Sequence, residues 1–72
     1  MNYSEMYNLD LGLTENQINS DWRSGYRPYG VNMVDGTYEC AWSTKAAMQS
    51  YPNKVGSAAV DVIALCNTIW KV

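Results

Sequence analysis

Residues 29–42 read YGVNMVDGTYECAW, and the fold is best predicted from this segment. Asp35-Gly36 stands between two runs of β-forming residues, which is the strongest short signal for a β-hairpin. A two-residue loop at these positions pairs Val34 with Thr37, and the pairing continues outward to Tyr29 and Trp42. We therefore predict a two-stranded antiparallel hairpin around Asp35-Gly36.

In this register the hairpin has one apolar face and one mostly polar face, because successive side chains of a strand point to opposite sides. The predicted polar face carries Asn32, Val34, Thr37, Glu39 and Ala41. An isolated hairpin is only marginally stable in water, so its apolar face needs helices to cover it. The residues of that apolar face are Tyr29, Val31, Met33, Tyr38, Cys40 and Trp42.

A helix is predicted before the hairpin, over about residues 15–24. Thr14 and Gln17 have the spacing of a capping box, in which each side chain bonds the backbone N–H of the other residue. Leu13 and Ile18 have the spacing of the hydrophobic staple that accompanies such a box. The helix should therefore begin directly after Thr14.

Two helices are predicted after the hairpin. The first covers about residues 44–51, with Ser43 as its cap, and ends before the proline that follows. The second begins after Ser57 and runs to about residue 71, because its apolar residues recur at the helical period. The β-branched run VDVI leaves a strand open as the alternative for residues 58–66.

The expected fold class is α+β, as a small single domain over residues 1–72. An N-terminal helix precedes the hairpin, and one short and one longer C-terminal helix pack on the apolar face of the hairpin. A chain of 72 residues buries only about 60% of its unfolded surface. Its stability therefore needs support from a disulfide, a metal, a partner or self-association.

The start of the chain, MNYSEMYNLD, lacks the basic and apolar regions of a signal peptide. No apolar stretch is long enough to span a bilayer, so we expect an intracellular, cytoplasmic protein without a membrane partner. In that compartment Cys40 and Cys66 would be reduced thiols, buried in the core and slow to react. A disulfide between them is the alternative.

The inventory of reactive side chains argues against an enzyme. The sequence contains no histidine, which removes the commonest general base and the usual partner of a serine or cysteine nucleophile. Two cysteines alone do not fill a tetrahedral zinc site, and the acidic residues do not have the spacing of a calcium loop. We therefore expect no enzymatic activity, no metal and no cofactor.

The stretch DWRSGYRPYG, residues 21–30, is the best functional lead, because it combines both arginines with a tryptophan and two tyrosines. Arginine and tyrosine frequently anchor protein interfaces. The predicted partner-binding residues are Arg23, Tyr26, Arg27 and Tyr29. Two alternatives are ion pairs between the arginines and local acids such as Asp21, and stacking of these side chains on nucleic-acid bases.

The net charge of −2 and the scattered cations do not form the concentrated basic patch of a duplex-binding domain. We expect a small, tyrosine-rich, non-enzymatic protein-interaction module that docks on a larger protein or complex. Its size and acidity are typical of phage-encoded inhibitors of host machinery, among them the anti-CRISPR proteins. The alternatives are a self-associating structural or accessory subunit, and a single-stranded nucleic-acid-binding protein that uses residues 22–29.

Overall fold

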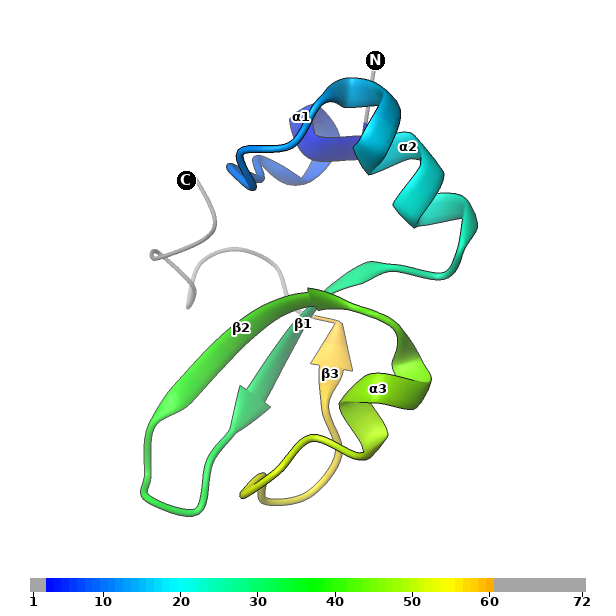
Figure 1. Cartoon of the computed structure of the whole chain (residues 1–72). Coiled ribbons are helices and arrows are strands. Elements are labelled where there is room, and N and C mark those ends of the chain that lie inside the picture. The colour runs from blue at the N-terminus through cyan, green and yellow to red at the C-terminus, as the bar shows by residue number, and fades with distance from the viewer. Residues whose placement is uncertain (1–2, 61–72) are drawn as a thin grey trace.

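The computed structural model describes residues 3–60 (Figure 1). The strands within this range form a sheet with the order β2-β1-β3, in which β1 pairs antiparallel with both neighbours. In Figure 1, α1 and α2 lie together beyond one end of the sheet, whereas α3 lies beside the strands. The result is a small α+β domain, as predicted. In chain order, its elements are α1 (Tyr3–Tyr7), α2 (Glu15–Arg23), β1 (Arg27–Asn32), β2 (Tyr38–Ser43), α3 (Lys45–Gln49) and β3 (Ala59–Val60).

The loop of the hairpin has three residues rather than the predicted two. The N–H of Met33 donates to the carbonyl oxygen of Thr37 at 2.8 Å. The N–H of Gly36 donates to the carbonyl oxygen of Met33 at 3.0 Å. Gly36 has a φ of 88°, whereas Asp35 does not have a positive φ. This is the pattern of a type I turn followed by a left-handed glycine, a common alternative to the two-residue loop.

The longer loop shifts the strand pairing by one residue, so that Tyr29 pairs with Ala41 and Val31 pairs with Glu39. A shift of one residue moves every side chain of one strand to the other face relative to its partner strand. The prediction of a single apolar face is therefore wrong. One face carries Tyr29, Val31 and Met33, and the opposite face carries Tyr38, Cys40 and Trp42.

Each face of the sheet has its own hydrophobic cluster. On one face, Met48 of α3 packs with Tyr29 and Val31, and all three residues are buried. On the other face, the buried Leu9 from the segment after α1 packs against the large side chains of β2. Because both faces are covered, the four consecutive residues 28–31 of β1 are all buried.

The first helix of the prediction is confirmed, but its cap is only half of a capping box. Thr14 Oγ1 accepts a hydrogen bond from the N–H of Gln17 at 3.1 Å, which starts α2 as expected. The Gln17 side chain does not reach back, since its Nε2 donates to Asp21 Oδ1 at 2.8 Å.

The short helix after the hairpin begins one residue later than predicted. Ser43 still pairs with Arg27 at the end of β2, so it cannot also cap the helix. Thr44 takes that role, because its Oγ1 accepts a hydrogen bond from the N–H of Ala47 at 3.2 Å.

The prediction that the longer C-terminal helix begins after Ser57 is wrong, because Ala59–Val60 form β3. These two residues pair with Gly30 and Tyr29 of β1, in agreement with the alternative prediction of a strand within residues 58–66. The remainder of the predicted helix, residues 61–71, lies outside the described residues. Within residues 3–60, no helix reaches the length and hydropathy required to cross a membrane.

Cys40 is disulfide-bonded, so the prediction of a reduced thiol is wrong for this residue. The sequence contains one other cysteine, Cys66, which lies outside the described residues. A disulfide restricts the unfolded chain and so stabilises the folded state. This is one of the forms of support that a chain of this length needs.

In the observed register, residue 30 must be a glycine, because a Cβ at this position would overlap the ring of Tyr38. Gly30→Ala should therefore destabilise the fold by about 1–3 kcal/mol. In a Tyr38→Ala background the same change should cost clearly less, because the obstructing ring is gone. Urea unfolding of the four proteins in this double-mutant cycle measures the coupling. Additive losses would contradict the register, since the two-residue loop would put these side chains on opposite faces.

The loop also predicts a pH effect. The Thr37 hydroxyl and then its backbone N–H donate to the Asp35 carboxylate, and these bonds lower the pKa of Asp35 below its ordinary value of 3.8. At pH values above the ordinary pKa, the ionised carboxylate of Asp35 stabilises the fold. This contribution is lost as the pH falls through the lower pKa that Asp35 has in the folded protein. Thr37→Val should raise the pKa of Asp35, whereas Thr37→Ser should keep it low. NMR titration of the Asp35 carboxyl carbon in both variants measures the difference, and equal pKa values would exclude a role for the hydroxyl.

Candidate functional site

The stretch 21–30 contributes to a cluster of aromatic rings at the junction of the helices and the sheet. Trp22, near the end of α2, is at its centre. The ring of Tyr3 stacks on Trp22 with 4.1 Å between centroids and 6° between planes. The ring centroids of Tyr7 and Trp42 lie 5.3 Å and 6.2 Å from that of Trp22. The ring centroid of Tyr26 lies 6.2 Å from that of Trp42. We call Tyr3, Tyr7, Trp22, Tyr26 and Trp42 the aromatic cluster.

Every residue of the aromatic cluster is half-buried, and none lies fully in the core. Tyrosine and tryptophan suit such positions because each combines an apolar body with a polar group that needs water or a partner. The indole N–H of Trp42 donates to Asp21 Oδ2 at 3.2 Å, while the other oxygen of Asp21 accepts from Gln17. Asp21 therefore ties α2 to Trp42 of β2.

Arg27 holds the connection between α2 and β1. Its guanidinium carbon lies 3.7 Å from the centre of the Trp22 ring, and its Nη1 donates to the carbonyl oxygens of Trp22 at 2.8 Å and Tyr26 at 2.6 Å. Tyr3 stacks on the same ring, and one face of an indole has no room for both groups at these distances. Tyr3 and Arg27 therefore occupy the two opposite faces of the Trp22 ring. Cation–π contact of a partly desolvated arginine is worth about 1–2 kcal/mol.

The alternative in which the arginines pair with Asp21 is not what the structure shows. The donors of Arg27 go to two carbonyl groups, and the Asp21 oxygens accept from Gln17 and Trp42. Within residues 3–60, no ion pair joins Arg23 to Asp21.

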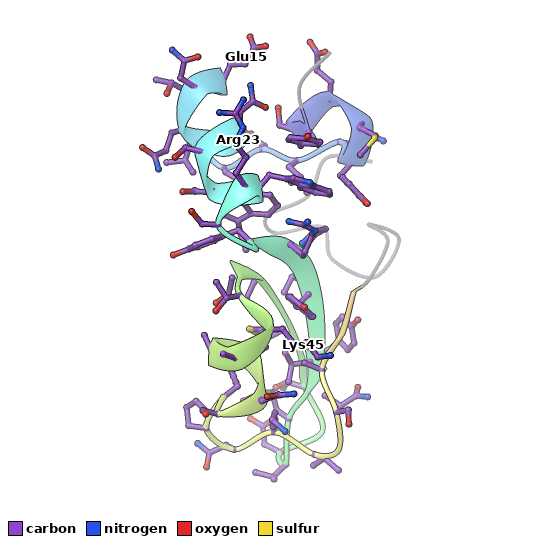
Figure 2. The ribbon with its side chains drawn as sticks, turned by 90° about the vertical axis from the view of Figure 1, so that its right-hand side faces the viewer. Glu15, Arg23 and Lys45 are labelled. Carbon is purple, nitrogen blue, oxygen red and sulfur yellow. The ribbon has the colours of Figure 1, made fainter. Side chains whose placement is uncertain are left out.

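The four predicted partner-binding residues do not form one surface. Arg23 is exposed on α2, as Figure 2 shows, and Tyr26 is half-buried beside Trp42. Arg27 is half-buried against Trp22. Tyr29 is only 7% exposed and packs under α3, in the separate cluster on the other face of the sheet. Of the four predicted residues, Arg23, which follows Trp22 in α2, is thus the exposed one, and Tyr26 is the one that belongs to the aromatic cluster.

Sequence reasoning missed Tyr3, Tyr7 and Trp42 as members of the site. They lie far from residues 21–30 in the chain, and only the packing of α1 and β2 brings them to Trp22. The composition did contain a signal, because a chain with tyrosine and tryptophan but no phenylalanine favours half-buried rings. Composition cannot say which rings meet.

Among the described residues, no group of three or more histidine, cysteine or acidic side chains is placed to hold a metal ion. No protein-family model matches the chain, and no match is found among curated proteins or solved structures. The geometry of the aromatic cluster is therefore the basis for assigning a function.

The role of Arg27 can be tested against its exposed neighbour. Arg27→Lys should destabilise the fold by about 1–2 kcal/mol, because an ammonium cannot cover the Trp22 ring with a planar group while it donates to two carbonyls. Arg23→Lys is the matched control and should change stability by less than about 0.5 kcal/mol. Urea unfolding followed by circular dichroism measures both effects. Equal stability of the two variants would show that Arg27 does not hold the connection.

Proposed function

We propose that this chain is a small non-enzymatic protein-interaction module, which docks on a larger protein through the aromatic cluster and the adjacent Arg23. The observation that carries the proposal is that five neighbouring tyrosine and tryptophan rings all remain half-exposed. Tryptophan, tyrosine and arginine are the residue types that most often dominate the energy of protein interfaces.

Internal contacts also support a docking role, because they hold the rings in place before any partner arrives. Arg27 and Tyr3 fix the two faces of Trp22, and Asp21 fixes the indole N–H of Trp42. A surface whose side chains are already ordered loses less conformational entropy on binding. The aromatic cluster is thus a preorganised surface that includes Tyr26, and the exposed Arg23 follows Trp22 directly in the chain.

Single-stranded nucleic acid is a weaker candidate for this surface. A base cannot stack on Trp22, because Tyr3 and Arg27 already cover its two faces. Two of the hydrogen bonds of Arg27 go to backbone carbonyls, and the carboxylate of Asp21 lies beside Trp42. A polyanion would meet little free positive charge here, and phosphate neutralisation supplies most of such binding.

We further propose that this chain is a phage-type, anti-CRISPR-like inhibitor, and that its partner belongs to the host machinery that it inhibits. The basis is the length of 72 residues and the net charge of −2. A self-associating accessory subunit is the alternative, which the mass in solution distinguishes. The cytoplasmic location stays a prediction, and the disulfide-bonded Cys40 weighs against it because a reducing compartment keeps thiols reduced.

Affinity capture with a matched pair of variants tests the docking surface. Wild type, Arg23→Ala/Tyr26→Ala and the control Glu39→Ala/Tyr51→Ala are immobilised and exposed to a host lysate. The Tyr51 hydroxyl donates to the Glu39 carboxylate, so the control also removes one tyrosine and one charge, but not from the aromatic cluster. We expect a protein that wild type and control retain equally and that the first variant retains at least about tenfold less.

Unfolding curves of all three proteins separate lost binding from lost folding. Equal retention of every captured protein by the three samples would contradict docking through the aromatic cluster. A dimeric mass of the purified chain that Arg23→Ala/Tyr26→Ala abolishes would favour self-association through the same surface.

A further inference from the structure

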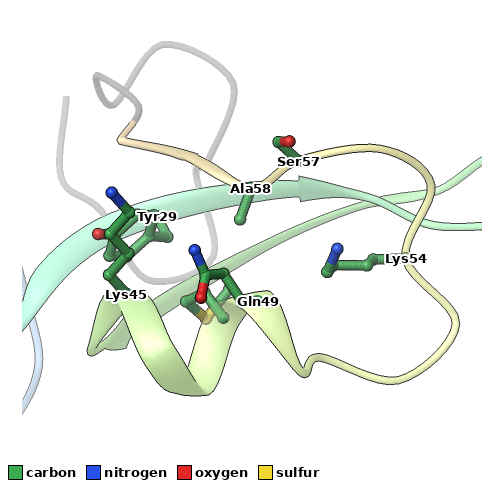
Figure 3. Close-up of a pocket in the computed structure, with 7 residues that line it drawn as sticks. Tyr29, Lys45, Gln49, Lys54, Ser57 and Ala58 are labelled. Atoms are coloured by element: carbon green, nitrogen blue, oxygen red, sulfur yellow. The ribbon is translucent and has the colours of Figure 1, made fainter.

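A small cavity opens between α3, β1 and the segment that leads to β3 (Figure 3). Its volume is about 160 Å³. A cavity of this size accommodates a body of about one aromatic ring, since an engineered cavity of about 150 Å³ in another protein binds benzene. It belongs to the face of the sheet covered by α3, whereas Trp42 of the aromatic cluster lies on the opposite face.

The floor of the cavity is apolar. Met48 is 1% exposed and Tyr29 is 7% exposed, and both belong to the buried cluster under α3. Ala58, from the segment before β3, closes the other side of the floor and packs against the same cluster. An apolar group placed on these side chains would be removed from water, which favours its binding.

The rim of the cavity is polar and positively charged. Lys45 and Gln49 come from α3, and Lys54 and Ser57 come from the facing segment, so the two lysines approach from different sides, as Figure 3 shows. The Nζ of Lys54 donates to the carbonyl oxygen of Gly56 at 2.8 Å, which holds this ammonium near the rim. Among the described residues that line the cavity there is no carboxylate.

Among residues 3–60, the acidic side chain that the strand pairing places on this face of the sheet is not at the rim. Glu39 is on the same face, but it accepts the hydroxyl of Tyr51 and is not among the lining residues. The rim therefore favours an anion.

The hydroxyl of Tyr29 supplies a second polar feature. Its side chain lines the cavity, and within residues 3–60 no hydrogen bond engages its hydroxyl. Polar groups on the wall of a cavity normally have a hydrogen-bond partner. A ligand oxygen that accepts this O–H would supply one.

We propose that this cavity binds a small organic carboxylate with an apolar body of about one ring. The carboxylate lies between Lys45 and Lys54 and accepts the hydroxyl of Tyr29, while the body rests on Met48 and Ala58. The apolar floor distinguishes this ligand from an inorganic anion, and the two cations distinguish it from a neutral hydrophobic molecule.

Benzoate is a suitable probe, in an NMR titration of the full chain labelled with ¹⁵N. We expect saturable shifts of the Met48 and Ala58 amides, with a Kd on the order of 1 mM for a ligand of this size. Benzamide has the same body without the charge, and inorganic phosphate has charge without the body. Each should bind at least about tenfold more weakly, because each lacks one of the two contributions.

Two variants test the assigned contacts. Lys45→Gln/Lys54→Gln should weaken benzoate binding at least about tenfold, and Lys45→Gln alone should have a smaller effect in the same direction. Tyr29→Phe should weaken benzoate binding about threefold to tenfold without loss of stability, because no residue within 3–60 forms a hydrogen bond with this hydroxyl. Tyr51→Phe, which removes a hydroxyl outside the cavity, should bind benzoate like wild type.

The proposal would be overturned by the absence of saturable shifts at tens of millimolar benzoate. It would also be overturned by equal affinity for benzamide or phosphate, or by unchanged affinity in a folded Lys45→Gln/Lys54→Gln variant. Loss of affinity in Tyr51→Phe equal to that in Tyr29→Phe would place the ligand outside the cavity and overturn it as well.

Discussion

The pairing of β1 with β2 positions every other element of the described structure. The loop between them spans three residues, with Gly36 in the left-handed region and the Asp35 carboxylate held by Thr37. This loop sets a register in which the large side chains of the two strands lie on opposite faces. A chain of this length must then cover both faces of its sheet, and it does so with Met48 of α3 on one face and Leu9 on the other.

The same register divides the arginine- and tyrosine-rich stretch between two surfaces. Trp42 meets Trp22 on one face and completes the aromatic cluster, whereas Tyr29 lies on the other face and borders the cavity under α3. In the register of a two-residue loop, Tyr29 and Trp42 would have shared a face. A difference of one residue in a loop therefore turns one expected interface into two candidate sites, one suited to a protein partner and one suited to a small anion.

Arg27 illustrates how a residue type that is common at interfaces can serve the fold instead. A planar guanidinium can lie flat on an indole and still donate hydrogen bonds within its own plane, which lysine cannot do. Arg27 uses both properties on Trp22 and the neighbouring carbonyls. What remains accessible at the aromatic cluster is Arg23 with half-buried rings, and this combination favours a protein surface over a polyanion as the partner in our proposal.

Features that depend on contacts over a few residues could be predicted from the sequence. The start of α2 follows from the hydroxyl of Thr14 bonding an amide three residues on, and the hairpin follows from Asp35-Gly36 between two β-forming runs. Together they are sufficient for the small α+β class. The tertiary structure alone decided the register, because the same dipeptide fits two loop lengths and only the packing of both faces selects one.

The tertiary structure also decided which rings meet. Tyr3, Trp22 and Trp42 come from three separate elements, and the partial burial that unites them depends on how α1, α2 and β2 pack. It also decided the state of Cys40, since a disulfide requires two sulfur atoms to meet across the fold. Local patterns carry no information on such contacts, because the free energy that selects them arises from side chains distant in the sequence.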